Sequence, residues 1–101
     1  VGPGGVSPEE AAELARTCTL NALAAAAAAV DGLDAVARVV KVVGYVASEP
    51  SFTGQPGVVD GASRLLGDVF GEQGAHARSA VGVAALPMDA PVEVELILAV
   101  R

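Results

Sequence analysis

The stretch HARSAVGVAALPMDAPVEVE, residues 76–95, decides how the last third of the chain folds. Its two ends are rich in Val and alternate apolar with other residues, a pattern typical of strands. We therefore expect strands over residues 77–85 and 92–100. The intervening LPMDAP, residues 86–91, carries the Pro and Asp that favour turns, so the sequence predicts that the two strands form a hairpin.

Three charged residues interrupt these apolar strands: Arg78, Glu93 and Glu95. Because side chains alternate between the faces of a strand, a hairpin paired through Ala85 and Val92 puts all three charges on one face. Arg78 and Glu93 are then about 20 Å apart along the hairpin, at ~3.3 Å per residue. If they cooperate, we expect them to do so across a subunit boundary. The alternative is that the glutamates are simply solvated, which is common on one face of an antiparallel sheet.

The first third of the chain predicts a long helix over residues 8–31. Ser7 is a suitable N-cap, Pro8 suits the first helical position, and Glu10 completes a capping box. The alanine run that follows has high helix propensity, and Gly32 is a typical residue for the end of a helix.

The middle of the chain predicts a strand and a second helix. Residues 35–48 are nearly continuously apolar and β-branched, which favours a strand buried on both sides. Residues 56–71 predict a helix that Gly71 ends, with an apolar stripe of Val58, Val59, Ala62, Leu65, Leu66, Val69 and Phe70. The elements total two helices and three strands. The helices can cover one sheet face, so the other apolar face needs further strands or another subunit.

Composition narrows the functional classes. The 101 residues suffice for one domain, and they are 52% hydrophobic with 3% aromatic residues, so we expect a Val-, Ala- and Leu-rich subunit that associates with copies of itself. The net charge is −6, and nucleic-acid binders need basic surfaces, so we expect no nucleic-acid partner. The apolar run at residues 20–30 is too short for a bilayer and follows no basic segment, so we expect neither a membrane partner nor a signal peptide.

Single residues give weaker indications. Cys18 has no partner for an internal disulfide, which fits a reducing compartment such as the cytoplasm, and its neighbours suggest a small buried apolar role. His76 is the only histidine, so one chain cannot assemble a histidine-based metal site, and we expect it to order its loop. We expect Tyr45 to lie in the core or at its rim.

The motif residues resemble the Rid (reactive intermediate deaminase, YjgF-type) family. The carboxy-terminal signature of that family runs approximately ARS-x-V-x-V-A-x-LP-x-x-x-x-VE-[IV]-E, and residues 77–95 match it without a gap. RVVKVVGYVAS is similar to the central strand of the family, and VVDGASRLLGDVFGE to its second helix. The resemblance covers about residues 6–101 and is nearest to a divergent branch of longer members.

The resemblance implies a chorismate-mutase-like α+β fold, with two helices on one face of a sheet, in a homotrimer joined through its sheets. It implies hydrolysis of enamine or imine acids to keto acids and ammonia in clefts between subunits. Arg78 then binds the substrate carboxylate, with Ser79 and Ala80 beside it, and Glu93 handles the water or proton. No cofactor or metal is implied. For Glu95 we favour a structural role, such as pairing with an arginine of a neighbouring subunit.

The chain also departs from the family pattern. Ala80 stands where many members have Cys, Gly82 where they often have Glu, and Asp60 where Asn is common. About fifty residues of further strands, with a substrate-side aromatic, precede this region in the family. We expect that these residues form a separate N-terminal polypeptide, that they were removed, or that they were lost in preparation. These departures keep a second hypothesis open, a trimeric carboxylate-binding module without catalysis. Ribonuclease activity, also attached to the family, is disfavoured by the acidic charge.

Overall fold

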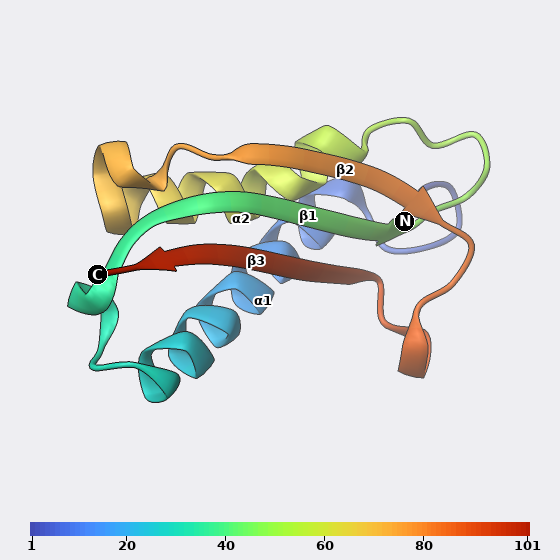
Figure 1. The fold of residues 1–101 in the computed structure, drawn as a ribbon. Helices are drawn as coiled ribbons and strands as arrows, with labels where there is room; N and C mark the ends of the chain where they lie inside the picture. The colour runs from blue at the N-terminus through green and yellow to red at the C-terminus, as the bar shows by residue number, and fades with distance from the viewer.

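Two helices lie against one face of a three-stranded sheet in the computed structural model, which describes residues 1–101 (Figure 1). This arrangement confirms the expected α+β class with both helices on one side. Three short 3₁₀ turns connect the longer elements, and the order along the chain is α1 (Pro8–Ala29), β1 (Val36–Ala47), α2 (Gln55–Phe70), β2 (Ala77–Val83) and β3 (Val92–Val100).

Local signals position both helices. The Ser7 hydroxyl accepts a hydrogen bond from the Glu10 backbone N–H at 3.1 Å, as expected of an N-cap. Helix α1 ends at Ala29, two residues before the predicted end, and Gly32 follows with a φ of 81° that favours glycine. Helix α2 is displaced by one residue from the prediction, and Gly71 ends it with a φ of 60°. Neither helix combines the length and apolarity needed to cross a bilayer.

The strand order β2-β1-β3 overturns the predicted hairpin. Strand β1 pairs in parallel with β2 and antiparallel with β3, so the two last strands lie on opposite sides of it. Beyond the strand pairing, the Ala47 N–H donates to the Pro91 carbonyl at 2.9 Å and the Ser48 N–H donates to the Val83 carbonyl at 3.0 Å. Residues 84–91 therefore pass around the end of β1 instead of forming a tight turn. The apolar β1 gains two partners this way, and α2 supplies the crossover that a parallel pair requires.

The pairing register also overturns the expected common charged face. Val42 is buried beneath the helices and pairs with Arg78, so Arg78 lies on the helix-covered side. Tyr45 lies on the opposite face and pairs with Glu93, while Val43 pairs with Glu95. The arginine and the two glutamates therefore project from opposite faces, on strands that β1 separates.

The core fills the space between the helices and the sheet. Val42, Val46 and Val59 are at most 1% exposed, and Gly44 lets α2 approach β1 closely. Val69, which the predicted stripe included, is 42% exposed. The far side of β1 has no cover in this chain, and its Val43 and Tyr45 are only half-buried. Burial of β1 on both sides, as predicted, is therefore not found within one chain.

Candidate functional site

Arg78 joins β2 to α2 at the edge of the sheet. Its Nη1 donates to Asp60 Oδ1 at 2.7 Å and to Ser63 Oγ at 3.4 Å. Asp60 and Ser63 are three residues apart on α2, a spacing that puts both side chains on one helix face. The remaining donors of the guanidinium, on Nε and Nη2, have no partner within the chain. The arrangement therefore fixes one side of the guanidinium and leaves a two-nitrogen edge for an external acceptor.

The Arg78–Asp60 ion pair orients more than it stabilises. The arginine side chain is 26% exposed and the aspartate side chain is 40% exposed. Pairs in such solvated positions contribute about 0–1 kcal/mol, because water and salt screen the attraction. Asp60 thus restricts the directions in which Arg78 can point. The sequence singled out Asp60 only as a departure from a pattern, and the structure gives it this contact.

A directional hydrogen-bond chain extends from Arg78 to the turn before β2. Ser63 Oγ lies 2.9 Å from His76 Nε2, and His76 Nδ1 lies 2.6 Å from the Gly74 carbonyl oxygen. A carbonyl oxygen can only accept, so Nδ1 carries a proton, and in the tautomer with its proton on Nδ1 the Nε2 atom accepts from the Ser63 hydroxyl. The expectation that His76 orders its loop fits these contacts. The sequence did not predict a role for Ser63, because no motif marks a serine on this helix.

The other predicted site residues do not gather around Arg78. Ala80 pairs with Gly44 and shares the helix-covered side, whereas Ser79 pairs with Val43 on the open side. Glu93 is exposed on the open side of β3. The structure thus brings Arg78 together with Asp60 and Ser63 and leaves Glu93 apart. The roles expected for Ser79, Ala80 and Glu93 stay predictions.

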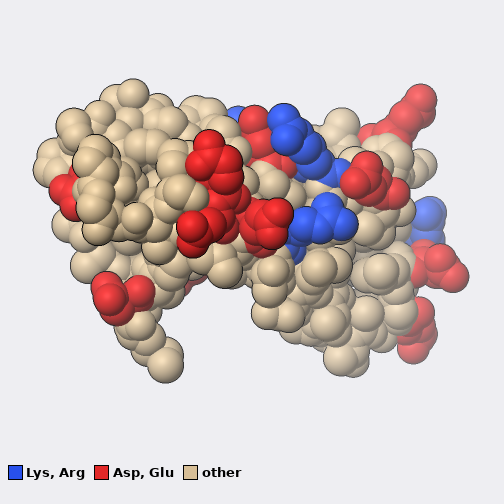
Figure 2. All heavy atoms as spheres, turned by 180° about the vertical axis from the view of Figure 1, so that it is seen from behind, with Lys and Arg blue, Asp and Glu red and all other residues tan.

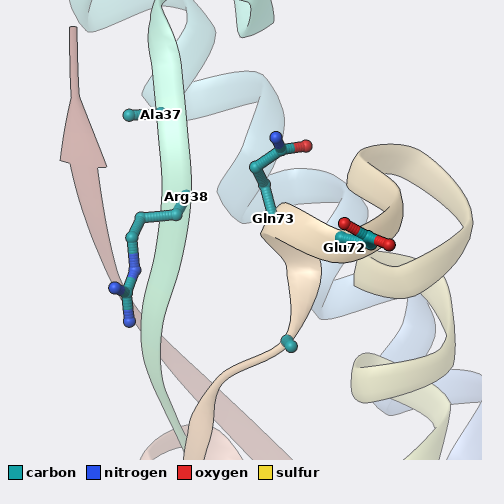
Figure 3. Close-up of a pocket in the computed structure, with 5 residues that line it drawn as sticks. Ala37, Arg38, Glu72 and Gln73 are labelled. Atoms are coloured by element: carbon teal, nitrogen blue, oxygen red, sulfur yellow. The ribbon is translucent and has the colours of Figure 1, made fainter.

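Two surface hollows lie away from this arginine. One of about 410 Å³ is lined by Ala37, Arg38, Glu72, Gln73 and Ala75, and Figure 3 shows Arg38 turned away from Glu72 and Gln73. Another, of about 380 Å³, opens at the end of β2, where Gln55 of α2 faces Gly82. The structure contains no group of three or more His, Cys, Asp or Glu side chains placed to hold a metal.

Cys18 is half-buried on α1. Desolvation raises the pKa of its thiol, and the negative charge of Glu93 acts in the same direction, against a backbone hydrogen bond that lowers it. The thiol is therefore a weak nucleophile, since the thiolate is the reactive form. This agrees with the small packing role expected from the sequence.

Comparison with known proteins gives consistent matches. A family model described as Endoribonuclease L-PSP matches residues 3–100. Protein TCP17 of Trypanosoma cruzi is 50% identical over 90 residues, which cover 88% of this chain and 56% of TCP17.

Two crystal structures share the fold. The protein Atu1372 of Agrobacterium tumefaciens, of unknown function, superposes with a TM-score of 0.96 at 41% sequence identity. The match covers all of this chain and 65% of the Atu1372 chain. A putative endoribonuclease from Shewanella oneidensis superposes with a TM-score of 0.91 at 28% sequence identity. The match covers 95% of this chain and 64% of the Shewanella chain. The chain thus spans 56% to 65% of the length of these relatives.

Proposed function

Because the chain belongs to the Endoribonuclease L-PSP family, the YjgF/Rid family that its motifs resemble, we propose that it hydrolyses reactive 2-imino acids to 2-keto acids and ammonia. The observation that carries this proposal is the state of Arg78. Its guanidinium is anchored through Nη1 and keeps the edge formed by Nε and Nη2 free. That edge matches the two oxygens of a carboxylate, and 2-imino acids carry a carboxylate next to the reacting carbon.

Hydrolysis of an imine requires few further groups from the protein. An imine carbon is already electrophilic, so a water that adds to it gives a carbinolamine, which loses ammonia and leaves the ketone. A carboxylate that accepts the proton from the attacking water and returns it to the leaving nitrogen supplies general acid–base catalysis. Glu93 is our candidate for that group. Binding of the substrate carboxylate by Arg78 fixes the orientation of the imine relative to the water.

A site that uses both Arg78 and Glu93 requires more than one subunit. Within one chain the two side chains project from opposite faces of the sheet, and β1 lies between their strands. We therefore propose a homotrimer, with the sites in clefts where Arg78 of one subunit meets Glu93 of another. The open sheet face, which carries Val81 and Ile97 at 42% and 49% exposure, supports such an assembly.

The decisive experiment measures keto-acid and ammonia release from a 2-imino acid generated in situ by an amino-acid oxidase. Arg78→Lys keeps the charge but loses the two-nitrogen edge, and we expect it to lower kcat/KM by about 10- to 100-fold, the equivalent of one charged hydrogen bond. Glu93→Gln should lower kcat. Arg64→Ala and Glu13→Gln alter an exposed arginine and an exposed glutamate on the helices, away from the open sheet face, and should leave turnover unchanged. Turnover that survives both Arg78→Ala and Glu93→Gln would exclude the assigned site.

A binding module without catalysis is the second candidate, favoured by the separation of Glu93 from Arg78 within the chain. It predicts saturable binding of small 2-keto acids that Arg78→Lys weakens, with no imine turnover by any variant.

Ribonuclease activity, which the family description suggests, has less support. The net charge is −6, and acidic side chains surround the few basic ones on the face that Figure 2 shows. RNA binding needs basic surfaces that neutralise phosphates and release the counterions of the RNA. Salt-sensitive RNA binding by this chain would be needed to support a ribonuclease function.

A further inference from the structure

The half-buried Ser63 and His76 form a constellation that imine hydrolysis does not use. A serine becomes a nucleophile when a base lies within hydrogen-bond reach and a third group orients that base. Ser63 Oγ is 2.9 Å from His76 Nε2, which accepts from the hydroxyl in the tautomer that carries its proton on Nδ1. The Gly74 carbonyl, 2.6 Å from Nδ1, holds the imidazole in that tautomer. Both conditions are therefore met.

The turn that presents His76 is firmly held. Gly74 is buried, and a Cβ at this position would lie 2.4 Å from the Leu66 carbonyl oxygen of α2. Only glycine permits this approach, which places the Gly74 carbonyl and the imidazole relative to α2. Ser63 and His76 both retain partial exposure, so a small molecule can approach the hydroxyl from solvent.

Arg78 adds positive charge at the point where negative charge would develop. Its Nη1 lies 3.4 Å from Ser63 Oγ, and Asp60 holds the guanidinium in place. A cation beside the oxygen stabilises the alkoxide character of an attacking serine and the oxyanion that attack creates. The three side chains thus combine a nucleophile, a base and an electrostatic stabiliser.

We propose that Ser63 is a nucleophile, with His76 as its general base, that accepts the acyl group of small carboxylic esters. Ser63 Oγ bonds to the ester carbonyl carbon while its proton passes to His76 Nε2. The bond from that carbon to the alcohol oxygen then breaks, and the alcohol leaves with the proton from His76. Water then adds to the acyl carbon while His76 takes its proton. The bond from that carbon to Ser63 Oγ breaks, the acid leaves, and His76 returns the proton to Ser63. The reaction consumes only ester and water.

Covalent labelling tests the proposal directly. Diisopropyl fluorophosphate reacts with an activated serine by forming an Oγ–P bond and expelling fluoride, while the base takes the proton. We expect the intact mass of the 101-residue protein to increase by one diisopropylphosphoryl group, and peptide sequencing to place it on Ser63. Removal of a general base costs about 10²- to 10⁴-fold, so His76→Gln should slow labelling by a factor in that range.

The controls separate reactivity from structure. Ser63→Ala should abolish the adduct, and Ser51→Ala, which alters an exposed loop serine, should label as the unaltered chain does. The proposal is wrong if the unaltered folded chain gains no adduct, if the adduct lies on another residue, or if His76→Gln labels at the unaltered rate. The first two results need no variant, so they decide the matter even if His76→Gln unfolds. They are also independent of imine hydrolysis, which forms no bond to Ser63.

Discussion

At the scale of single residues, Gly44 shows how tightly β1 and α2 pack. A Cβ at this position would lie 2.2 Å from Val59 Cγ2 and 2.8 Å from Cγ1, so Val59 or the helix must move. We expect Gly44→Ala to lower the free energy of unfolding by about 1–3 kcal/mol, as overpacking of a core does. Equilibrium urea denaturation measures this difference. Gly67→Ala on α2, where nothing lies within 4 Å, should instead add about 0.5–1 kcal/mol. Equal effects of the two substitutions would contradict the close approach.

The thiol of Cys18 gives a pH-dependent prediction. Burial raises the pKa of Cys18 in the folded chain, so the folded state holds the thiol proton more tightly than the unfolded state does. The stability that this confers is complete below the unfolded pKa, about 8.5, and is lost as the pH rises through the folded pKa. We expect iodoacetamide to alkylate the folded chain more slowly than the denatured chain at pH 8.5. Cys18→Ala should reduce the alkaline loss of stability. Alkylation of the folded chain at the denatured rate would show that the thiol is not shielded.

The residues of the candidate site were only partly predictable. Arg78 stands in the signature of the family that residues 77–95 resemble, and that resemblance singled it out. The contact between Ser63 and His76 joins positions 13 residues apart across a turn, and its geometry depends on where α2 lies against β2. Residue types carry no information about such a distance. The same reason explains why Asp60 was noticed only as a departure from a pattern.

At the scale of elements, the helices were predictable and the strand pairing was not. Caps and propensities act over a few residues, and they placed both helix ends within two residues. Pairing joins strands that are distant along the chain. The short segment between β2 and β3 suggested a hairpin, yet β1 lies between them. The strand–helix–strand sequence that leads from β1 to β2 was the better signal, because it is typical of parallel neighbours.

The packing of α1 against α2 yields a prediction from two glycines on one helix. A Cβ on Gly61 would lie 2.0 Å from the Ala12 carbonyl oxygen of α1, whereas a Cβ on Gly57 would meet nothing within 4 Å. Because a backbone carbonyl cannot rotate away as a side chain can, we expect Gly61→Ala to destabilise the protein by at least the ~1–3 kcal/mol typical of overpacking. Gly57→Ala should be neutral or stabilising, since alanine favours helices. Thermal unfolding measures both, and a stable Gly61→Ala variant would show that the helices are farther apart.

At the scale of the whole molecule, the chain is a thin slab. Its principal extents are 43 × 25 × 17 Å, because a single helix layer covers a single sheet. Most domains bury both faces of a largely apolar sheet. No helix covers the open face of the sheet (Figure 1). Val81 and Ile97 are exposed on that face, and Glu93 and Glu95 project from it. The proposed homotrimer, or the additional length present in the relatives, would cover that face.

Two valines of equal exposure test the trimer. Val81 on the open face and Val69 on α2 are both 42% exposed, so lysine at either position adds the same charge at a similar solvent contact. We expect the unaltered protein to sediment at three times the 9.9 kDa of one chain and Val81→Lys to sediment as a single chain. The reason is that burying a lysine in a sheet-to-sheet interface removes its charge from water, at a cost of several kcal/mol. Val69→Lys should remain trimeric, since α2 faces away from the open side. The open face is not the interface if the unaltered chain sediments as a monomer or if both variants dissociate equally. Either result would also exclude a site built from Arg78 and Glu93 of different subunits.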